Sequence, residues 1–254
     1  MLSDLRTELT RLCAGVPFAT GLAADVGGER ILLNAQRPFP AASLIKLGIA
    51  AYGHELWQRQ QEMLTAQVVL QEADLVGGAG LLRLLTPKTY SVADLLTLMI
   101  TVSDNTATNL LIARWGMPAI NEWLTSHFPG AQLQRRLMDG HAAGDNVMTA
   151  SAGLQLLQAA LTTKDGYWQV VQRALRHQVS QIKLTYPLAS GQFQGEWANK
   201  TGELGNVEHD AARLTIAGQR ADCVLLTEFD AGQRKQAIML QERVGQCLCT
   251  YLNS

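Results

Sequence analysis

Segments that favour β-strands lie at both ends of this 254-residue chain, and a long helical segment separates them. Near the start, the runs FATGLAADV and RILLNAQ are joined by Gly27 and Gly28, a connection that favours a tight hairpin. Towards the other end, GEWANKTGEL, HDAARLTIAG and ADCVLLTEF are rich in strand-forming residues and are separated by glycine or charged turns. Because these strands do not alternate with helices, they predict one antiparallel sheet built from both chain ends.

The helical patterns complete this prediction. Leu5, Leu9 and Leu12 recur at helical spacing, and a closing helix is expected from about Gly232 to Leu252. Between the strands, the helical runs are SLIKLGIAAYGHELWQRQ, SVADLLTLMITV, NTATNLLIARW and TASAGLQLLQAALTT. We therefore expect an α+β fold in which a five-stranded antiparallel sheet is flanked by the N- and C-terminal helices. Residues 1–38 and 184–254 would form this α/β lobe. Residues 39–183 would form an inserted all-helical lobe, and the two lobes together would form one domain.

Composition restricts the partners. A formal net charge of −1 provides no basic surface for nucleic acid, and no run of apolar residues is long enough for a membrane span. A small-molecule substrate and a monomer are the expectation. The segment MLSDLRTELTRLCAGV lacks the features of an export signal, so we expect a cytoplasmic protein, or a periplasmic or secreted one if a leader is missing. The four cysteines form no C-x-x-C pair, which favours buried thiols over a zinc or redox site.

The stretch AASLIKLGIAAYG places Ser43 three residues before Lys46. Residues three apart share one face of a helix, so a neutral lysine amine could accept the serine proton. Serine is also a preferred helix cap, and this explanation stays open at this point. The pair Ser180 and Lys183 has the same spacing, so the spacing alone decides nothing.

Two further tripeptides favour the catalytic interpretation. In Ser103-Asp104-Asn105, a serine hydroxyl can pass a proton to a leaving nitrogen and an asparagine amide can hold a carbonyl, although all three residue types also cap helices. In Lys200-Thr201-Gly202, a charge and a hydroxyl precede a glycine that lets a substrate lie close to the backbone. The two tripeptides follow Ser43 in order, and no comparable pair follows Ser180.

Together, S-x-x-K, S-D-N and K-T-G resemble the class A β-lactamases and the related penicillin-binding proteins. The resemblance extends over nearly the whole chain and includes DLVGGAGLL and LLTLMITVSDNTATNLLI. It implies the fold described above and a serine hydrolase that needs no metal or cofactor.

The resemblance also implies a role for each matching residue. Ser43 would be the acylated nucleophile, Lys46 its proton partner, and Ser103 the relay to the leaving nitrogen. Asn105 would bind the substrate amide, and Lys200, Thr201 and Gly202 would bind the acidic end of the substrate. The oxyanion hole would be formed by the backbone N–H groups of Ser43 and Glu203.

Two positions depart from the family pattern. Class A enzymes hold the deacylating water with a glutamate and an asparagine on a loop between S-D-N and K-T-G, but RRLMDGHAAGDNVMTASAG contains no glutamate. Asp139 is the nearest candidate and Asp145 the next, although aspartate before glycine also favours a turn. Glu203 would repel the carboxylate of a β-lactam unless its side chain points away or pairs with a base.

These features predict acylation of Ser43 by a β-lactam or a related amide, followed by hydrolysis. The alternatives are an esterase or D-Ala-D-Ala peptidase, and a penicillin-binding or sensor protein that keeps its adduct. The scattered histidines and the absence of G-x-S-x-G and H-E-x-x-H do not favour a Ser-His-Asp or zinc hydrolase.

Overall fold

A computed structural model of the chain describes residues 1–142 and 144–254. The α-helices and 3-10 turns of the described residues are α1 (Leu2–Ala14), η1 (Ala42–Leu44), α2 (Ile45–Gln58), η2 (Glu72–Asp74), η3 (Leu82–Leu84), α3 (Val92–Thr101), α4 (Asn105–Trp115), α5 (Met117–His127), α6 (Ala150–Thr162), α7 (Gly166–Arg176), α8 (Tyr186–Ala189) and α9 (Arg234–Leu252). The strands are β1 (Ala19–Val26), β2 (Glu29–Leu33), β3 (Phe39–Pro40), β4 (Gln67–Val69), β5 (Thr89–Ser91), β6 (Ala131–Gln132), β7 (Val147–Met148), β8 (Glu196–Glu203), β9 (Glu208–Ile216) and β10 (Gln219–Glu228).

The main sheet has five strands in the order β2-β1-β10-β9-β8, and its ladders are antiparallel. The strands from the two chain ends meet where β1 pairs with β10, with Leu22 opposite Leu225. Gly27 and Gly28 have φ values of +63° and +94°, which a two-residue hairpin turn requires and glycine tolerates. The predicted antiparallel sheet, built from both ends of the chain, is confirmed.

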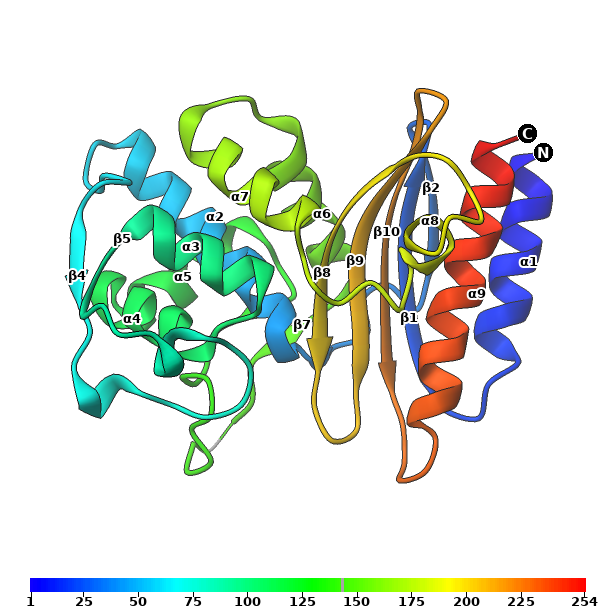
Figure 1. The fold of residues 1–254 in the computed structure, drawn as a ribbon. Helices are drawn as coiled ribbons and strands as arrows, with labels where there is room; N and C mark the ends of the chain where they lie inside the picture. The colour runs from blue at the N-terminus through cyan, green and yellow to red at the C-terminus, as the bar shows by residue number, and fades with distance from the viewer. Residues whose placement is uncertain (143) are drawn as a thin grey trace.

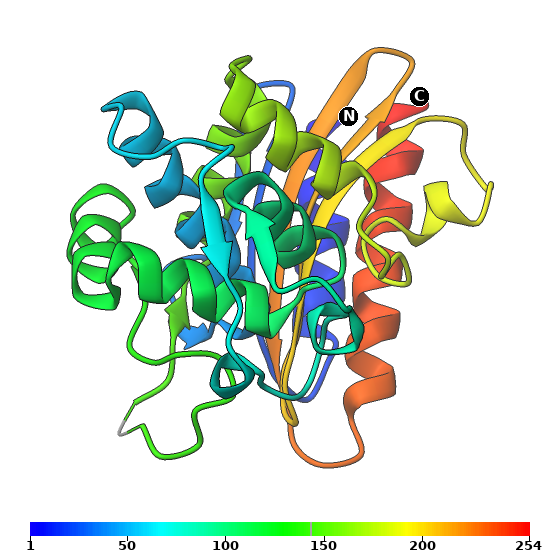
Figure 2. The same ribbon diagram turned by 60° about the vertical axis from the view of Figure 1, so that its left-hand side comes forward.

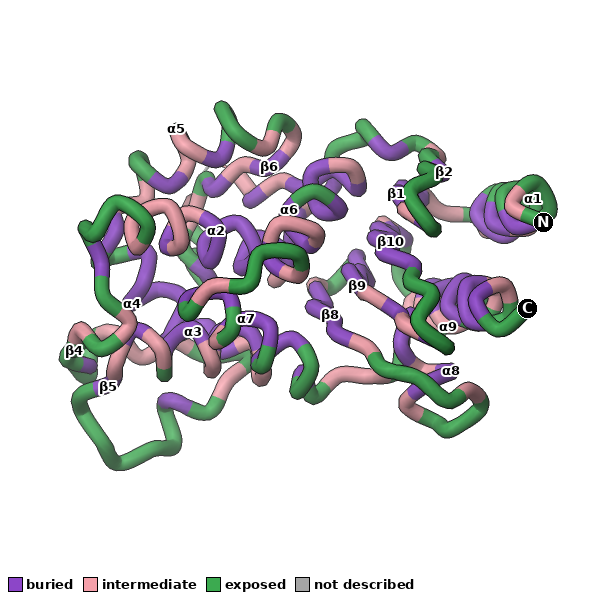
Figure 3. Tube along the Cα trace, turned by 90° about the horizontal axis from the view of Figure 1, so that it is seen from above, coloured by how far each residue is buried: buried purple, intermediate pink, exposed green. Residues whose placement is uncertain are grey.

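Helices cover both faces of this sheet (Figures 1 and 2). The helices α1 and α9 lie side by side on one face, and the helical segment between β2 and β8 lies against the other face and beyond it. Successive strand residues point to opposite faces, so Leu225 of β10 packs towards α1 and α9 and Leu226 towards the other side. Viewed from above, the buried positions of α1 and α9 face the sheet (Figure 3).

The inserted segment carries short strands as well as helices, so it is not purely helical as expected. The strand β7 pairs with β3 and β6, and β4 pairs with β5. Each of these ladders involves only two or three residues, too few for a repeating pattern of alternating side chains in the sequence. The strand β3 ends three residues before Ser43, so its pairing with β7 helps to fix where the η1 turn begins.

Among the residues that the structure describes, we find no helix with the length and apolar character that crossing a bilayer requires.

Candidate active site

Ser43 lies in the 3-10 turn η1, directly before α2. The cap position of α2 belongs to Leu44, so a capping role does not explain Ser43. Instead, Lys46 Nζ lies 3.1 Å from Ser43 Oγ. The preceding residue, Ala42, has φ of +47°, a conformation that residues with a Cβ seldom adopt. Backbone strain of this kind persists where the surroundings enforce it, and it is frequent at active sites.

Lys46 is fully buried and contacts several oxygen atoms. Its Nζ lies 2.7 Å from Ser103 O, 2.9 Å from Asn105 Oδ1 and 3.0 Å from Ser103 Oγ. The two carbonyl oxygens can only accept hydrogen bonds, so a neutral amine would give both of its hydrogens to them. Its lone pair would then be free to receive a hydroxyl proton. Burial, followed by repulsion from Lys200, holds the pKa of Lys46 well below its usual value, which favours this neutral form.

Ser103 connects the two buried lysines. Its Oγ lies 3.0 Å from Lys46 Nζ and 3.1 Å from Lys200 Nζ, so one hydroxyl contacts both amines. Lys200 also donates to Thr201 O at 2.8 Å. Burial, together with the positive charge of Lys183, lowers the pKa of Lys200 to about 7. Ser103 has φ of +54°, a second strained position close to Ser43.

The other two residues of the S-D-N tripeptide hold the surrounding chain. Asn105 donates from Nδ2 to Gly77 O at 3.1 Å, so its amide joins the 77–80 loop to Lys46. Asp104 is buried and caps α4 by accepting from Ala107 N, and its second oxygen accepts from Leu81 N and Leu82 N. Asp104 therefore shapes the loop rather than the reactive surface.

The strand β8 brings Lys200-Thr201-Gly202 against the Ser43 turn. A Cβ on Gly202 would lie 3.2 Å from Ala42 Cβ and 3.3 Å from Leu44 N, so glycine permits this close approach. The Thr201 hydroxyl accepts from Gln178 Nε2 at 2.8 Å, which fixes it at the pocket surface. The strand thereby brings the backbone of Gly202 and Glu203 beside the Ser43 turn.

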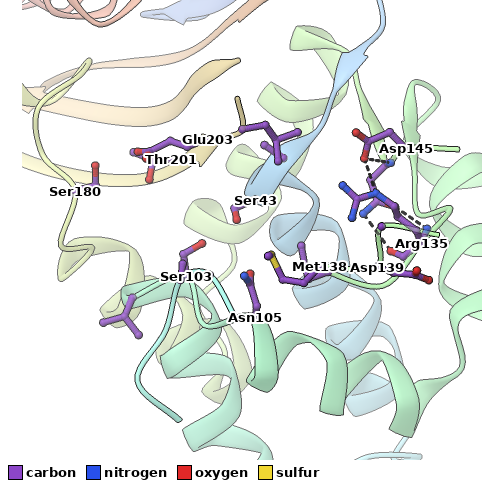
Figure 4. Close-up of a pocket in the computed structure, with 18 of the residues that line it drawn as sticks. Ser43, Ser103, Asn105, Arg135, Met138, Asp139, Asp145, Ser180, Thr201 and Glu203 are labelled. Carbon is purple, nitrogen blue, oxygen red and sulfur yellow. Dashed lines mark hydrogen bonds and ion pairs between the residues drawn. The ribbon is translucent and has the colours of Figure 1, made fainter. Parts of the chain in front are cut away.

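A cavity of about 820 Å³ lies at the junction of the sheet and the helical segment. This is large enough for a drug-sized molecule. It is lined by Ser43, Ser103, Asn105, Thr201 and Glu203, which confirms that the sequence motifs meet in space. Figure 4 shows their side chains converging from η1, from the start of α4 and from β8.

Asp139 lines the rim of this cavity without approaching Ser43. Its Oδ1 accepts from His141 N at 3.0 Å, as in a local turn, and its side chain points away from Ser43 (Figure 4). Met138, the preceding residue, points towards Asn105 instead. Asp145, the other candidate, accepts from Arg135 Nε at 2.9 Å. Both carboxylates are therefore engaged within the loop segments 134–142 and 144–146.

The second S-x-x-K pair lies beside the same cavity. Ser180 lines the cavity, but Lys183 directs its amine to Glu203 and Glu208 rather than to Ser180. Within the described part of the chain, a lysine amine therefore lies within hydrogen-bonding distance of the Ser43 hydroxyl and not of the Ser180 hydroxyl.

The sequence model described as "Beta-lactamase enzyme family" matches residues 4–252. The chain belongs to this beta-lactamase family. Beta-lactamase L2 of Stenotrophomonas maltophilia is 30% identical over 228 residues, which cover 85% of this chain and 74% of that protein. The resemblance predicted from the three motifs is thus confirmed, and the family identifies the chain as a hydrolase.

Solved structures of a class A beta-lactamase and of the protein PBP-A share the fold. An ancestral class A beta-lactamase superposes with a TM-score of 0.87 at 22% identity, covering 97% of this chain and 99% of that one. A mutant of PBP-A, solved as an acyl-enzyme complex with penicillin G, superposes with a TM-score of 0.85 at 22% identity. The match covers 99% of this chain and 97% of that one. The predicted fold class is confirmed.

Three residues that the motifs did not reveal organise the beta-lactamase site. The Asn109 amide bonds both the backbone N–H and the carbonyl of Leu137, with distances of 2.9 and 3.0 Å. The side-chain oxygen of Asn146 accepts hydrogen bonds from Gln134 N and Arg135 N, and its backbone carbonyl accepts one from Ala41 N. Gln178 positions Thr201. Asn109 and Asn146 bond backbone atoms and Gln178 bonds a side chain, each distant in sequence, and a single sequence carries no spacing signal for such contacts.

Proposed function

We propose that this protein is a serine hydrolase of β-lactams and related amides, in which Ser43 forms an acyl-enzyme. The observation that carries the proposal is the contact between Lys46 Nζ and Ser43 Oγ in a buried network shared with Ser103. Lys46 takes the Ser43 proton, and Oγ attacks the substrate carbonyl. The C–N bond then breaks, and a proton passes from Lys46 through the Ser103 hydroxyl to the leaving nitrogen.

The remaining groups bind the substrate. The backbone N–H groups of Ser43 and Glu203 stabilise the oxyanion, a contribution of about 3 to 4 kcal/mol for each donor in comparable enzymes. The Asn105 amide binds the substrate amide, and Lys200 with Thr201 binds its acidic group. The close packing of Gly202 on the Ser43 turn supports this arrangement, because both N–H groups then border one space.

Deacylation is proposed to be the slow step. It needs a base that activates water beside the acyl group, but the carboxylates at the cavity are engaged elsewhere. Asp139 points away, Asp145 pairs with Arg135, and Glu203 pairs with Lys183. The acyl-enzyme should therefore accumulate before it is hydrolysed.

The test is a reaction with a chromogenic cephalosporin, followed by absorbance and by intact mass. We expect a burst of one product per protein, an adduct on the protein, and then slow continuous hydrolysis. Rapid hydrolysis without an adduct would contradict the slow step alone. The absence of both adduct and hydrolysis would overturn the whole proposal.

A further inference from the structure

Glu203 presents a carboxylate to the cavity from the end of β8. Its side chain is 49% exposed, and it lines the cavity together with Thr201 (Figure 4). Lys183, which is fully buried, lies with Nζ 3.0 Å from Glu203 Oε1. The carboxylate is therefore held in place at the surface of the pocket.

The lysine that holds Glu203 is itself fixed. Lys183 Nζ lies 2.6 Å from Glu208 Oε2 and 3.2 Å from His209 O, and Arg234 pairs with the other oxygen of Glu208. Within the described part of the chain, no hydrogen bond reaches Glu203 Oε2. This oxygen is thus an acceptor that a ligand can use, on a side chain whose position is already set.

Most of the charged groups at the cavity surface are acidic, whereas those buried behind it are basic. The charged side chains that line it within the described residues are three carboxylates (Asp139, Asp145 and Glu203) and the Arg135 guanidinium. The amines of Lys46 and Lys200 are fully buried behind the serine hydroxyls. The site is therefore basic in its interior and acidic at its surface. Thr201 and Glu203 lie two residues apart on one side of β8, so an anion at Thr201 would lie about 7 Å from the Glu203 backbone.

We propose that Glu203 is a specificity-determining residue whose anchored carboxylate favours substrates that carry a cationic group beside β8, in addition to the acidic group bound at Lys200 and Thr201. This inference rests on the proposed function and names its substrate class, an amide with both an ammonium and a carboxylate. A substrate with the carboxylate alone meets the repulsion of Glu203 without the compensating contact.

The ionisation of Glu203 is consistent with this role. Burial opposes its charged form, but the adjacent Lys183 and the more distant Lys200 and Arg234 outweigh burial and lower its pKa. Glu203 is therefore negatively charged at neutral pH.

Ampicillin and benzylpenicillin provide a matched pair of probes, because they differ by one amine on the acyl side chain. Their dissociation constants are measured at pH 6 with the Ser43→Ala protein, so that binding does not depend on acylation. The preference for ampicillin is the dissociation constant of benzylpenicillin divided by that of ampicillin. Glu203→Gln in this background should reduce this ratio by about two- to fivefold, the range for a half-exposed ion pair. Lys183 keeps Glu208 and His209 O as partners in this variant, and unfolding temperatures check that the fold is retained.

Glu196→Gln is the matched control, since it removes the same charge from the exposed start of the same strand. It should leave the preference unchanged. An equal preference in Glu203→Gln and its parent, or no measurable binding of either penicillin, would overturn the inference. Acylation of the protein with Ser43 intact is measured in parallel: its absence contradicts the proposed function, whereas the binding ratio still decides the role of Glu203.

Discussion

At the residue scale, the two buried lysines of the site have pKa values shifted in the same direction but need opposite protonation states. In the proposed mechanism, Lys46 acts as a base and must be neutral, whereas Lys200 binds an acidic group and must be charged. Both lie within 3.1 Å of Ser103 Oγ, so the charge of one affects the other. The low pKa of Lys46 is thus partly a consequence of the charge on Lys200.

This arrangement predicts the pH dependence of acylation by a carboxylate-bearing penicillin. The second-order acylation rate should rise with pH as Lys46 loses its proton. It should then fall above about pH 7, where Lys200 loses its charge. Loss of one charge-assisted hydrogen bond corresponds to a fall of about tenfold or more. The measurement is the rate of adduct formation between pH 5 and 9.

The methyl ester of the same penicillin is the control for this prediction, because it has no carboxylate for Lys200 to attract. Its profile should rise and then level off without the alkaline fall. Identical profiles for the acid and the ester would show that Lys200 does not bind the acidic group.

At the scale of elements, Asp104 joins the start of α4 to the 81–82 loop through three backbone N–H groups. Asp104→Asn replaces one acceptor oxygen with a donor, which leaves buried N–H groups without a partner. The expected loss is about 1 to 3 kcal/mol of the free energy of unfolding, measured by denaturant titration.

Asp94→Asn supplies the comparison, since Asp94 occupies the exposed capping box of α3 with Ser91. Asp94→Asn should lower the free energy of unfolding by less than about 1 kcal/mol, because water can replace the missing acceptor. Equal losses at the two positions would contradict the structural role of Asp104.

At this scale, the sequence predicts most of the helices and strands of the main sheet and its flanking layers. The hairpin at Gly27 and Gly28 and the strands β8 to β10 follow from local patterns, and the structure contains them. The short strands β3 to β7 were not predicted, because ladders of two or three residues depend on contacts between distant segments. The same reason applies to Asn109 and Asn146, whose partners are backbone atoms of a loop.

The site residues show the same division. Ser43, Lys46, Ser103 and Lys200 could be predicted to meet because three motifs occurred together. The direction of the Asp139 side chain could not be predicted, because a turn before glycine and a catalytic loop have the same local sequence. The pairing of Glu203 with Lys183 joins two elements, and only the fold reveals it.

At the scale of the whole molecule, we expect activity to depend on how closely the sheet lies against the inserted helical segment. Gly202 marks this contact, since a Cβ there would meet Ala42 and Leu44. Gly202→Ala should move β8 away from the Ser43 turn by a few tenths of an ångström. We expect the acylation rate to fall about tenfold or more, because the reacting groups tolerate little displacement.

Gly205→Ala tests whether this effect is specific, because a Cβ at Gly205 meets open space. Both variants should retain cooperative thermal unfolding, and the Gly205 variant should retain the parent rate. A normal acylation rate in Gly202→Ala would indicate that the contact between strand and turn is not needed for the reaction.

The central claim is that Ser43, and not the second serine of the same spacing, is the nucleophile. The most direct measurement is peptide mapping by mass spectrometry after brief incubation with benzylpenicillin, applied to the unmodified chain, Ser43→Ala and Ser180→Ala. Both serines line the cavity, but only Ser43 has a lysine amine within hydrogen-bonding distance in the described structure. We predict an adduct on the peptide containing Ser43, its loss in Ser43→Ala and its retention in Ser180→Ala. An adduct that persists in Ser43→Ala, or that maps to Ser180, would contradict this account.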